Sequence, residues 1–437
     1  MQNTEPNNSL FNYCRNASNI EGDEFVGIKS YSVDDMQEIR IVFPMGYRLL
    51  DDDDQIRNSV LELVSVLEAY RDEQSRIPQS DSIENNNMNR FPIKSYMTVI
   101  DQYLNNGYYQ IREQQFARGT SGNINWSRTI KHESNSVIPS KNGFIYPIYR
   151  IKKHSQSDKH LITEINKYCV YVSFLKIGWL YNLNPPQKHD NYFSLDIYKQ
   201  YLKDYILQTN VDNDKILFQA MLDILNYENP NNPPEDFYYG TNNFEFIWEN
   251  LVQDTYGNVD KSYYFPRTKW ILKDNKEKTK PPLQPDTIMK FANNVFVLDA
   301  KYYKYGISKN EKDLPNSSSI NKQISYGEFI VTNPKFQSEI DNGLNVYNAF
   351  LMPYNSEDEL YHNSSDSDDY YSIGEAISDW KDGSQYYHRV QGILVDVNRL
   401  MKNNIRPSDK EIIKLSDAIK KSIKENEELK DRNGNND

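Results

Sequence analysis

The stretch QPDTIMKFANNVFVLDAKYYKYG, residues 284–306, decides the fold of the C-terminal half of the chain. Two short apolar runs, TIMKF (287–291) and VFVL (295–298), lie on either side of Asn293-Asn294. Asparagine tolerates the positive φ of a tight hairpin turn, so the stretch predicts two antiparallel strands. Both faces of the hairpin carry apolar residues, which is typical of strands inside an α/β sheet. We therefore expect an α/β core built around this hairpin.

A two-residue turn at Asn293-Asn294 predicts which residues of the hairpin oppose one another. In that register Asp286 pairs with Lys301, and Asp299 is the diagonal neighbour of Asp286, at roughly 7–8 Å. Because side chains alternate along a strand, all three lie on one face, near one end of the hairpin.

Two carboxylates at this spacing can share a Mg²⁺ ion, which prefers oxygen ligands. The metal lowers the pKa of a bound water and neutralises charge that develops on a phosphodiester, and a neighbouring lysine can stabilise the transition state. The alternative is a salt-bridged hairpin, in which exposed pairs contribute little to stability. Against this alternative, the charges directly follow the apolar run 295–298, where burial is expected.

Composition limits the class of protein. The chain has 437 residues, with 50 Lys and Arg against 62 Asp and Glu, a formal charge of −12. Its two cysteines cannot form a disulfide framework or a four-thiolate zinc site. No apolar stretch approaches the ~18 residues of a membrane span, and the first residues lack the pattern of a secretory signal. We expect a cytoplasmic protein without membrane contacts, whose acidic balance argues against indiscriminate binding of polyanions.

The length predicts more than one domain, and the Pro- and Asn-rich segment 229–237 is the best boundary. Residues 1–230 are expected to form a DNA-recognition or partner-interaction region, whose first 35 residues are a flexible arm. Residues 231–437 are expected to form the catalytic domain, with an amphipathic helix at its C-terminal end.

Two segments are candidates for DNA contact. Residues 94–105 predict a helix and 108–130 a β-ribbon, which together resemble a winged-helix or small recognition module. The candidate phosphate and base contacts there are Arg118, Asn125, Trp126 and Arg128; the alternative is an ordinary hairpin with Trp126 as a core anchor. The basic run 267–280, which includes Arg267 and Lys269, leads directly to Asp286 and is expected to contact the DNA backbone. Its alternative is a solvated loop.

Pro285-Asp286, twelve intervening residues and Asp299-Ala300-Lys301 resemble the core motif of the PD-(D/E)XK nucleases. More narrowly, the chain resembles the LlaJI-type restriction endonucleases, distant relatives of McrC nuclease subunits. Besides that motif, the resemblance rests on GNINWSRTI (122–130), GTNNFEFIWENLV (240–252), INKQISYGEFI (320–330) and YNAFLMPY (347–354).

The resemblance assigns expected roles to particular residues. Asp286, Asp299 and Ala300 would hold the metal, and Lys301 would be the catalytic lysine. Glu249, next to Trp248, would be the acid that the family carries on a nearby helix; the alternative is a solvated glutamate beside a packed tryptophan. Gln323 resembles the glutamine that contacts the metal site or the scissile phosphate.

Together with the resemblance, these observations predict a mixed sheet flanked by helices, of the PD-(D/E)XK type, with an N-terminal mixed α+β region for which a winged-helix-like form is one alternative. The predicted function is that of a Mg²⁺-dependent type II restriction endonuclease, which cuts double-stranded DNA in a restriction–modification system that defends against phage. The resemblance implies a cognate methyltransferase encoded nearby and, in some members, a GTPase motor subunit of the McrB kind. Double-strand cleavage implies a homodimer or two sequential nicks. The alternatives are a McrC-like subunit that requires the GTPase, and a DNA-binding adaptor that does not cut.

Overall fold

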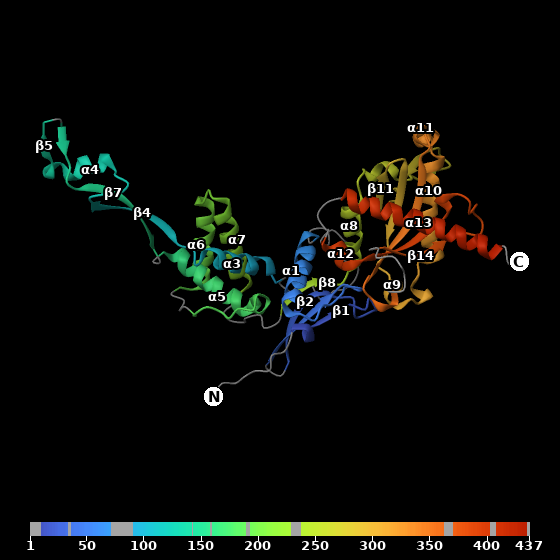
Figure 1. Cartoon of the computed structure of the whole chain (residues 1–437), viewed down its shortest axis with the longest axis horizontal. Helices are drawn as coiled ribbons and strands as arrows, with labels where there is room; N and C mark the ends of the chain where they lie inside the picture. Colours follow the sequence, from blue (N-terminus) through green and yellow to red (C-terminus); the bar gives the residue numbers. More distant parts are fainter. Residues whose placement is uncertain are drawn as a thin grey trace. The chain divides into compact units, whose positions relative to one another are not determined.

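The chain folds into two compact units, one of which is inserted into the sequence of the other (Figure 1). The computed structural model describes residues 10–33, 36–70, 91–141, 143–157, 160–188, 193–228, 237–361, 370–402 and 408–434. The core unit comprises Met1–Met88 and Glu235–Asp437, and the inserted unit comprises Asn89–Pro234. The predicted boundary after residue 230 lies outside the described residues. The predicted grouping of all residues up to 230 differs from this division, because the N-terminal segment belongs to the core unit.

A four-stranded sheet explains why the N-terminal segment belongs there. Its strands β1 (Cys14–Asn16), β2 (Val26–Val33), β3 (Met36–Phe43) and β8 (Phe237–Thr241) lie in the order β1-β3-β2-β8. Strand β2 therefore pairs with a strand that follows it by about two hundred residues in the sequence. The expected arm is wrong for residues 10–33, which form the short helix η1 (Leu10–Tyr13) and two strands with buried apolar residues such as Val26 and Ile28. Helix α1 (Asp53–Ala69) follows β3 in the chain.

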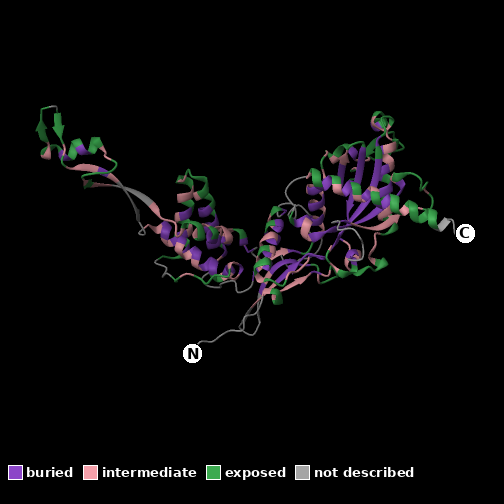
Figure 2. Ribbon diagram, in the orientation of Figure 1, coloured by how far each residue is buried: buried purple, intermediate pink, exposed green. Residues whose placement is uncertain are grey.

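A second, five-stranded sheet forms the centre of the core unit. Its order is β11-β12-β13-β15-β14, in which the three central strands are parallel and the two edge strands antiparallel. The strands are β11 (Thr287–Phe291), β12 (Asn294–Ala300), β13 (Asn345–Tyr354), β14 (Tyr370–Ala376) and β15 (Val390–Asp396). Every residue of β12 is buried, and Figure 2 shows the central strands in the colour of buried residues. The prediction of a mixed α/β core around this hairpin is confirmed.

Helices cover both faces of this sheet. On one face, Ile288, Val295 and Val297 pack against Tyr326 and Ile330 of α10 (Ser317–Thr332), the helix that connects β12 to β13. The other face carries the alternate side chains of the hairpin and is covered by α8 (Phe244–Tyr256) and α13 (Asp409–Gly434). The shorter elements of this unit are η3 (Lys261–Tyr264), β9 (Lys269–Ile271), β10 (Glu277–Thr279), α9 (Tyr305–Ser308), η4 (Glu311–Asp313), η5 (Pro334–Phe336), α11 (Gln337–Asp341), η6 (Glu359–Tyr361), η7 (Tyr386–His388) and α12 (Val397–Lys402).

The inserted unit combines a helical part with a long β-ribbon. Its larger helices are α3 (Ile93–Asn106), α5 (Leu161–Tyr181), α6 (Leu195–Gln208) and α7 (Asp212–Tyr227). Strands β4 (Ile111–Gly119) and β7 (Tyr149–Ser157) pair along their whole length, and between them lie α4 (Trp126–Glu133), η2 (Ser134–Ser136), β5 (Ile138–Ser140) and β6 (Gly143–Ile145). The ribbon expected within 108–130 is wrong, because β4 pairs with β7 and residues 126–133 are helical. A winged helix is accordingly not observed in this segment.

Within the ranges that the structure describes, no helix is both long and apolar enough to cross a membrane.

Candidate active site

The predicted hairpin forms, but its turn lies one residue earlier than expected. Strands β11 and β12 pair Phe291 with Asn294, so Ala292 and Asn293 form the two-residue loop. Ala292 takes a positive φ of 50°. The side-chain amide of Asn294 donates a hydrogen bond to the carbonyl oxygen of Phe291, at 3.2 Å, which helps to hold Asn294 in the strand.

The earlier turn changes which charged residues oppose one another. Thr287 pairs with Leu298, so the next position of the ladder brings Asp286 opposite Asp299, and the predicted pairing of Asp286 with Lys301 is wrong. Because the register differs by an even number of residues, each side chain stays on its predicted face. A carboxylate oxygen of Asp286 accepts a hydrogen bond from the backbone N–H of Ala300, at 2.9 Å. This bond holds the carboxylate of Asp286 beside the end of β12, where Asp299 lies, and the charge of Asp299 raises the pKa of Asp286.

Lys301 belongs to this cluster through Asp299. Its Nζ lies 2.5 Å from Oδ2 of Asp299, and the two side chains are only 19% and 6% exposed. The backbone N–H of Lys301 donates to the carbonyl oxygen of Leu351 on β13, which fixes the chain just beyond β12. Burial lowers the pKa of Lys301, but the Asp299 carboxylate more than offsets this, and the net shift is upward. Lys301 is therefore a charged ammonium group in a largely buried place.

Helix α8 contributes a third carboxylate. Burial raises the pKa of Glu249, and the negative charge of Asp299 raises it further. Burial also raises the pKa of Asp286, followed in size by the charges of Asp299 and Glu249. Trp248, the neighbour of Glu249 on α8, is fully buried, and its indole N–H donates to the carbonyl oxygen of Leu351. Glu249 itself is half-buried.

Helix α10 places Gln323 against β12. Gln323 is 1% exposed, and its Nε2 donates a hydrogen bond of 2.7 Å to the carbonyl oxygen of Val297. Its Oε1 is a buried acceptor that has no hydrogen-bond partner among the described residues. On the same helix, the hydroxyl of Tyr326 donates to the carbonyl oxygen of Gln284, at 3.0 Å, and so holds the segment that leads to Asp286.

Lys261 is a residue of this site that the sequence did not reveal. Its Nζ donates a hydrogen bond of 2.8 Å to the backbone carbonyl oxygen of Asp286, and its charge lowers the pKa of Glu249. No motif surrounds Lys261. Only the course of the chain after α8, which returns η3 to the start of β11, brings it to the site.

The donor set fits a hard divalent cation. Asp286, Asp299 and Glu249 together carry more negative charge than Lys261 and Lys301 can balance. The described residues contain no group of three or more His, Cys, Asp or Glu side chains that could hold a metal ion by themselves. A Mg²⁺ ion does not require such a group, because it is commonly bound by one or two carboxylates and retains several waters. The unpartnered Oε1 of Gln323 is one acceptor that a bound water could satisfy.

The candidate DNA contacts of the inserted unit have partners within the protein. Oδ1 of Asn125 accepts a hydrogen bond from the backbone N–H of Arg128 and caps α4. Arg118 pairs with the buried carboxylate of Glu133, at 2.9 Å. Trp126 is 52% exposed, so the alternative of a core anchor is wrong.

Arg128 and the two candidates of the basic run are placed as follows. The guanidinium of Arg128 lies 4.0 Å from the centre of the Phe116 ring. Arg267 is exposed, and Lys269 pairs with Glu277 at 2.7 Å on the hairpin β9–β10. This hairpin belongs to the core unit, which also contains the carboxylate cluster, whereas Arg118, Asn125, Trp126 and Arg128 belong to the inserted unit.

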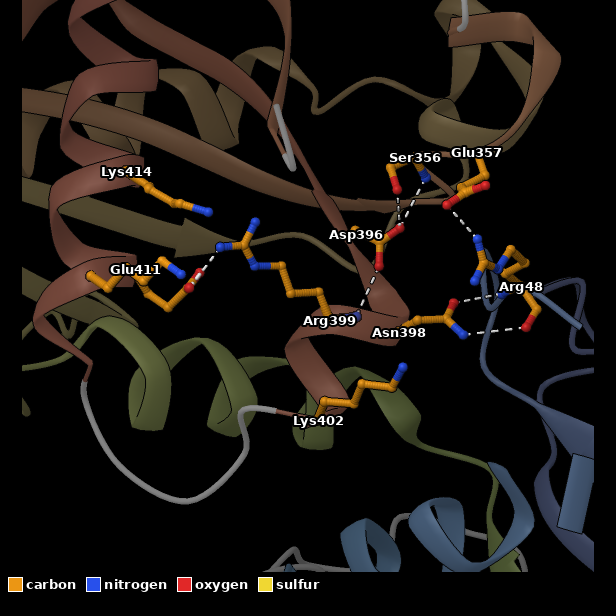
Figure 3. A pocket seen from close by; sticks show the side chains of 10 residues that line it. Arg48, Ser356, Glu357, Asp396, Asn398, Arg399, Lys402, Glu411 and Lys414 are labelled. Carbon is orange, nitrogen blue, oxygen red and sulfur yellow. Dashed lines mark hydrogen bonds and ion pairs between the residues drawn. The ribbon is translucent and has the colours of Figure 1, made fainter. Parts of the chain in front are cut away.

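A separate cavity of about 460 Å³ lies in the core unit beside α12 and α13 (Figure 3). Its basic residues are Arg48, Arg399, Lys402, Lys410 and Lys414. Its carboxylates already have partners, since Asp396 accepts three hydrogen bonds, Glu357 pairs with Arg48 and Glu411 pairs with Arg399. The carboxylates that line the cavity are therefore already engaged within the protein.

The mixed α/β fold, with a buried acidic cluster at the end of a central strand, is that of a nuclease-like protein. Comparison of the sequence with known families narrows this class. Residues 25–377 match the LlaJI restriction endonuclease family. The chain belongs to this family, as its motifs predicted, and is thereby assigned to the restriction endonucleases.

Comparison with curated proteins and with solved structures does not narrow the family assignment further. No curated protein matches the chain. Among solved structures, the chain is similar to one from the refined half-complex of the tetradecameric assembly of Thermococcus gammatolerans McrB AAA+ hexamers with bound McrC. The identity is 12%, the TM-score 0.32, and the match covers 91% of this chain and 83% of that chain. At this TM-score, the similarity supports no assignment of a partner.

Proposed function

We propose that the chain is a Mg²⁺-dependent endonuclease of the PD-(D/E)XK type that cuts both strands of DNA at a defined site, as a type II restriction endonuclease. The observation that carries the proposal is the position of Asp286 and Asp299 directly after the last paired residues of the hairpin, with Asp286 bonded to the N–H of Ala300 and Lys301 paired to Asp299. Family membership supports the substrate class, since restriction endonucleases act on DNA.

The residues of the site take separate roles in this proposal. Asp286, Asp299 and the backbone carbonyl of Ala300 would hold the Mg²⁺ ion, which supplies an activated water and neutralises charge on the phosphodiester. Lys301, which is charged and largely buried, stabilises negative charge on the phosphate oxygens as the bond to the attacking oxygen forms. The free Oε1 of Gln323 accepts a hydrogen bond from a water at the site and so helps to orient it.

Glu249 has a supporting role. Its raised pKa and its position beside Asp299 suit either a water-mediated contact to the metal or acceptance of a proton from the attacking water. Both roles require the carboxylate of Glu249, so Glu249→Gln is expected to slow cleavage while preserving the buried packing of α8.

Partners and assembly follow from the same chemistry. One site of this kind is present among the described residues, so cleavage of two strands requires either a second copy of the chain or two successive nicks. A cognate methyltransferase would protect host DNA. A GTPase subunit remains a second candidate for what drives cleavage, and the experiment below distinguishes it.

The test uses the purified full chain and a plasmid of known sequence, with Mg²⁺, with Mg²⁺ and GTP, and with EDTA. The proposal predicts linear product with defined ends in Mg²⁺ alone and none in EDTA. Absence of cleavage in Mg²⁺, followed by cleavage only when GTP and a GTPase encoded beside this gene are added, would replace it by the GTPase-dependent alternative. DNA binding without cleavage under all conditions would support the adaptor.

A further inference from the structure

The hairpin β9–β10 is an exposed projection close to the candidate active site in the sequence. Its strands pair through Trp270 and Lys278, and all residues from 267 to 281 are exposed. Backbone hydrogen bonds from Lys280 to Thr268 and from Leu283 to Pro266 close its base. The chain leaves this base and reaches Asp286 three residues after Leu283. The hairpin is thus tied to the carboxylate cluster by a short connection.

The two faces of the hairpin differ in chemistry. Opposed residues of an antiparallel pair share a face, and successive residues alternate. Trp270 therefore shares a face with Lys278, and the same alternation adds Leu272, Lys276 and Lys280, without any carboxylate on the strands. We call this face the tryptophan face.

The opposite face is electrically balanced. It carries Lys269, Ile271, Glu277 and Thr279, and Lys269 and Glu277 form an ion pair of 2.7 Å. The two charged side chains of this face therefore neutralise each other. Ile271 is its exposed apolar side chain.

The tryptophan face has the composition of a nucleic-acid contact. Trp270 is 62% exposed and Leu272 is 44% exposed, so neither serves as a core residue. Lys278 and Lys280 form no ion pair with any residue that the structure describes, and Lys276 pairs only with Asp274 in the turn. Unpaired lysines beside exposed apolar side chains match a polyanion whose groove presents apolar base edges, in a chain whose total charge is −12.

We propose that the tryptophan face binds double-stranded DNA beside the phosphodiester that is cut. A two-stranded β-ribbon fits the major groove of DNA. Lys278 and Lys280 contact backbone phosphates, while Trp270 and Leu272 lie against base edges in the groove. This inference rests on the proposed function, since it makes the hairpin the element that positions DNA at Asp286 and Asp299.

The test measures binding separately from cleavage. The protein is the full chain carrying Asp299→Asn, which should bind DNA without cutting it. The probe is a fluorescently labelled duplex of about one hundred base pairs. It is taken from a plasmid that the wild-type chain cleaves, or from any plasmid if the wild-type chain cleaves none. Fluorescence anisotropy gives the Kd in Mg²⁺ at several salt concentrations. Trp270→Ala and Lys278→Ala are compared with Ile271→Ala, on the opposite face, and with Lys424→Ala, which removes the same charge from an exposed position of α13.

Trp270→Ala is expected to raise the Kd about tenfold, whereas Ile271→Ala leaves it within about twofold. Lys278→Ala is expected to lower the slope of log Kd against log salt by about 0.9, the value of one phosphate contact; Lys424→Ala leaves the slope unchanged. Equal effects of Trp270→Ala and Ile271→Ala, or of the two lysine variants, would overturn the inference. If the wild-type chain does not cut but the four variants behave as stated, the proposed function fails and the DNA-binding hairpin stands.

Discussion

Removal of one charge from the candidate site is expected to stabilise the metal-free protein. The change is Asp286→Asn, which keeps the size of the side chain and an oxygen that can accept the hydrogen bond from the N–H of Ala300. Burial, together with the charges of Asp299 and Glu249, raises the pKa of Asp286 to about 7. A carboxyl whose pKa is raised by folding destabilises the native state as the pH rises from its unfolded pKa to its folded pKa. At pH 8 this penalty is fully present in the wild-type chain.

The magnitude follows from that shift. Each pKa unit corresponds to about 1.36 kcal/mol, so the ceiling at pH 8 is about 4 kcal/mol. The variant exchanges a charge-assisted hydrogen bond to Ala300 for a neutral one, which costs about 1 kcal/mol. Relaxation of the neighbouring charges lowers the penalty further, and we expect a net gain of about 1–2 kcal/mol.

Urea unfolding at pH 8 in EDTA measures this gain, and the same experiment at pH 5 should show a smaller one, because part of the penalty is then absent. Asp379→Asn, at an exposed position of the same unit, is the control and should change neither value. Added Mg²⁺ should reverse the order, since a ligand that binds the native wild-type site stabilises it. A variant that is less stable than the wild type at pH 8 in EDTA would refute the electrostatic reasoning.

Three further changes test the packing around the site and the inserted unit. Trp248→Phe removes the hydrogen bond from the indole N–H to the carbonyl oxygen of Leu351. The free energy of unfolding in urea should fall by only about 1 kcal/mol, because the N–H of Lys301 still donates to that oxygen. An unchanged free energy would show that this hydrogen bond does not contribute. Gly27→Ala should destabilise the core unit by about 3 kcal/mol or more, since a Cβ there would lie 2.2 Å from the carbonyl oxygen of Tyr239 at φ 146°; a wild-type melting temperature would contradict the β2–β8 pairing. Glu133→Gln weakens the pairs with Arg118 and Arg150, so amide exchange should become faster in α4 and stay unchanged in β12. Unaltered exchange in α4 would contradict this expectation.

The sequence predicted the hairpin of the candidate site well because its two strands and its turn are adjacent in the chain. Apolar residues on both faces indicated a buried position, and β12 is wholly buried. The turn was misplaced by one residue, since Ala292 rather than Asn294 takes the positive φ. The observed register differs from the predicted one by two residues, so every side chain of the hairpin still lies on its predicted face. The difference does change which residues lie across from Asp286.

Long-range pairing explains what the sequence could not reveal. Strand β2 pairs with β8, which follows the inserted unit in the chain. The alternating pattern of a short strand does not indicate which other strand it pairs with. For the same reason β4 was assigned a ribbon with the residues just after it, whereas its partner β7 begins thirty residues later. Lys261 lies at the site only because η3 returns to β11, and a single lysine in the sequence carries no sign of that.

The central claim is that Asp286, Asp299 and Lys301 form a metal-dependent nuclease site. The most direct measurement is the rate of cleavage of a plasmid by the purified wild-type chain, Asp299→Asn and Asp379→Asn under single-turnover conditions in Mg²⁺, with anisotropy as a check that each still binds DNA. Asp299→Asn should cut about a thousandfold or more slowly than the wild type, Asp379→Asn should cut at the wild-type rate, and both should still bind DNA. Wild-type cleavage by Asp299→Asn would contradict it.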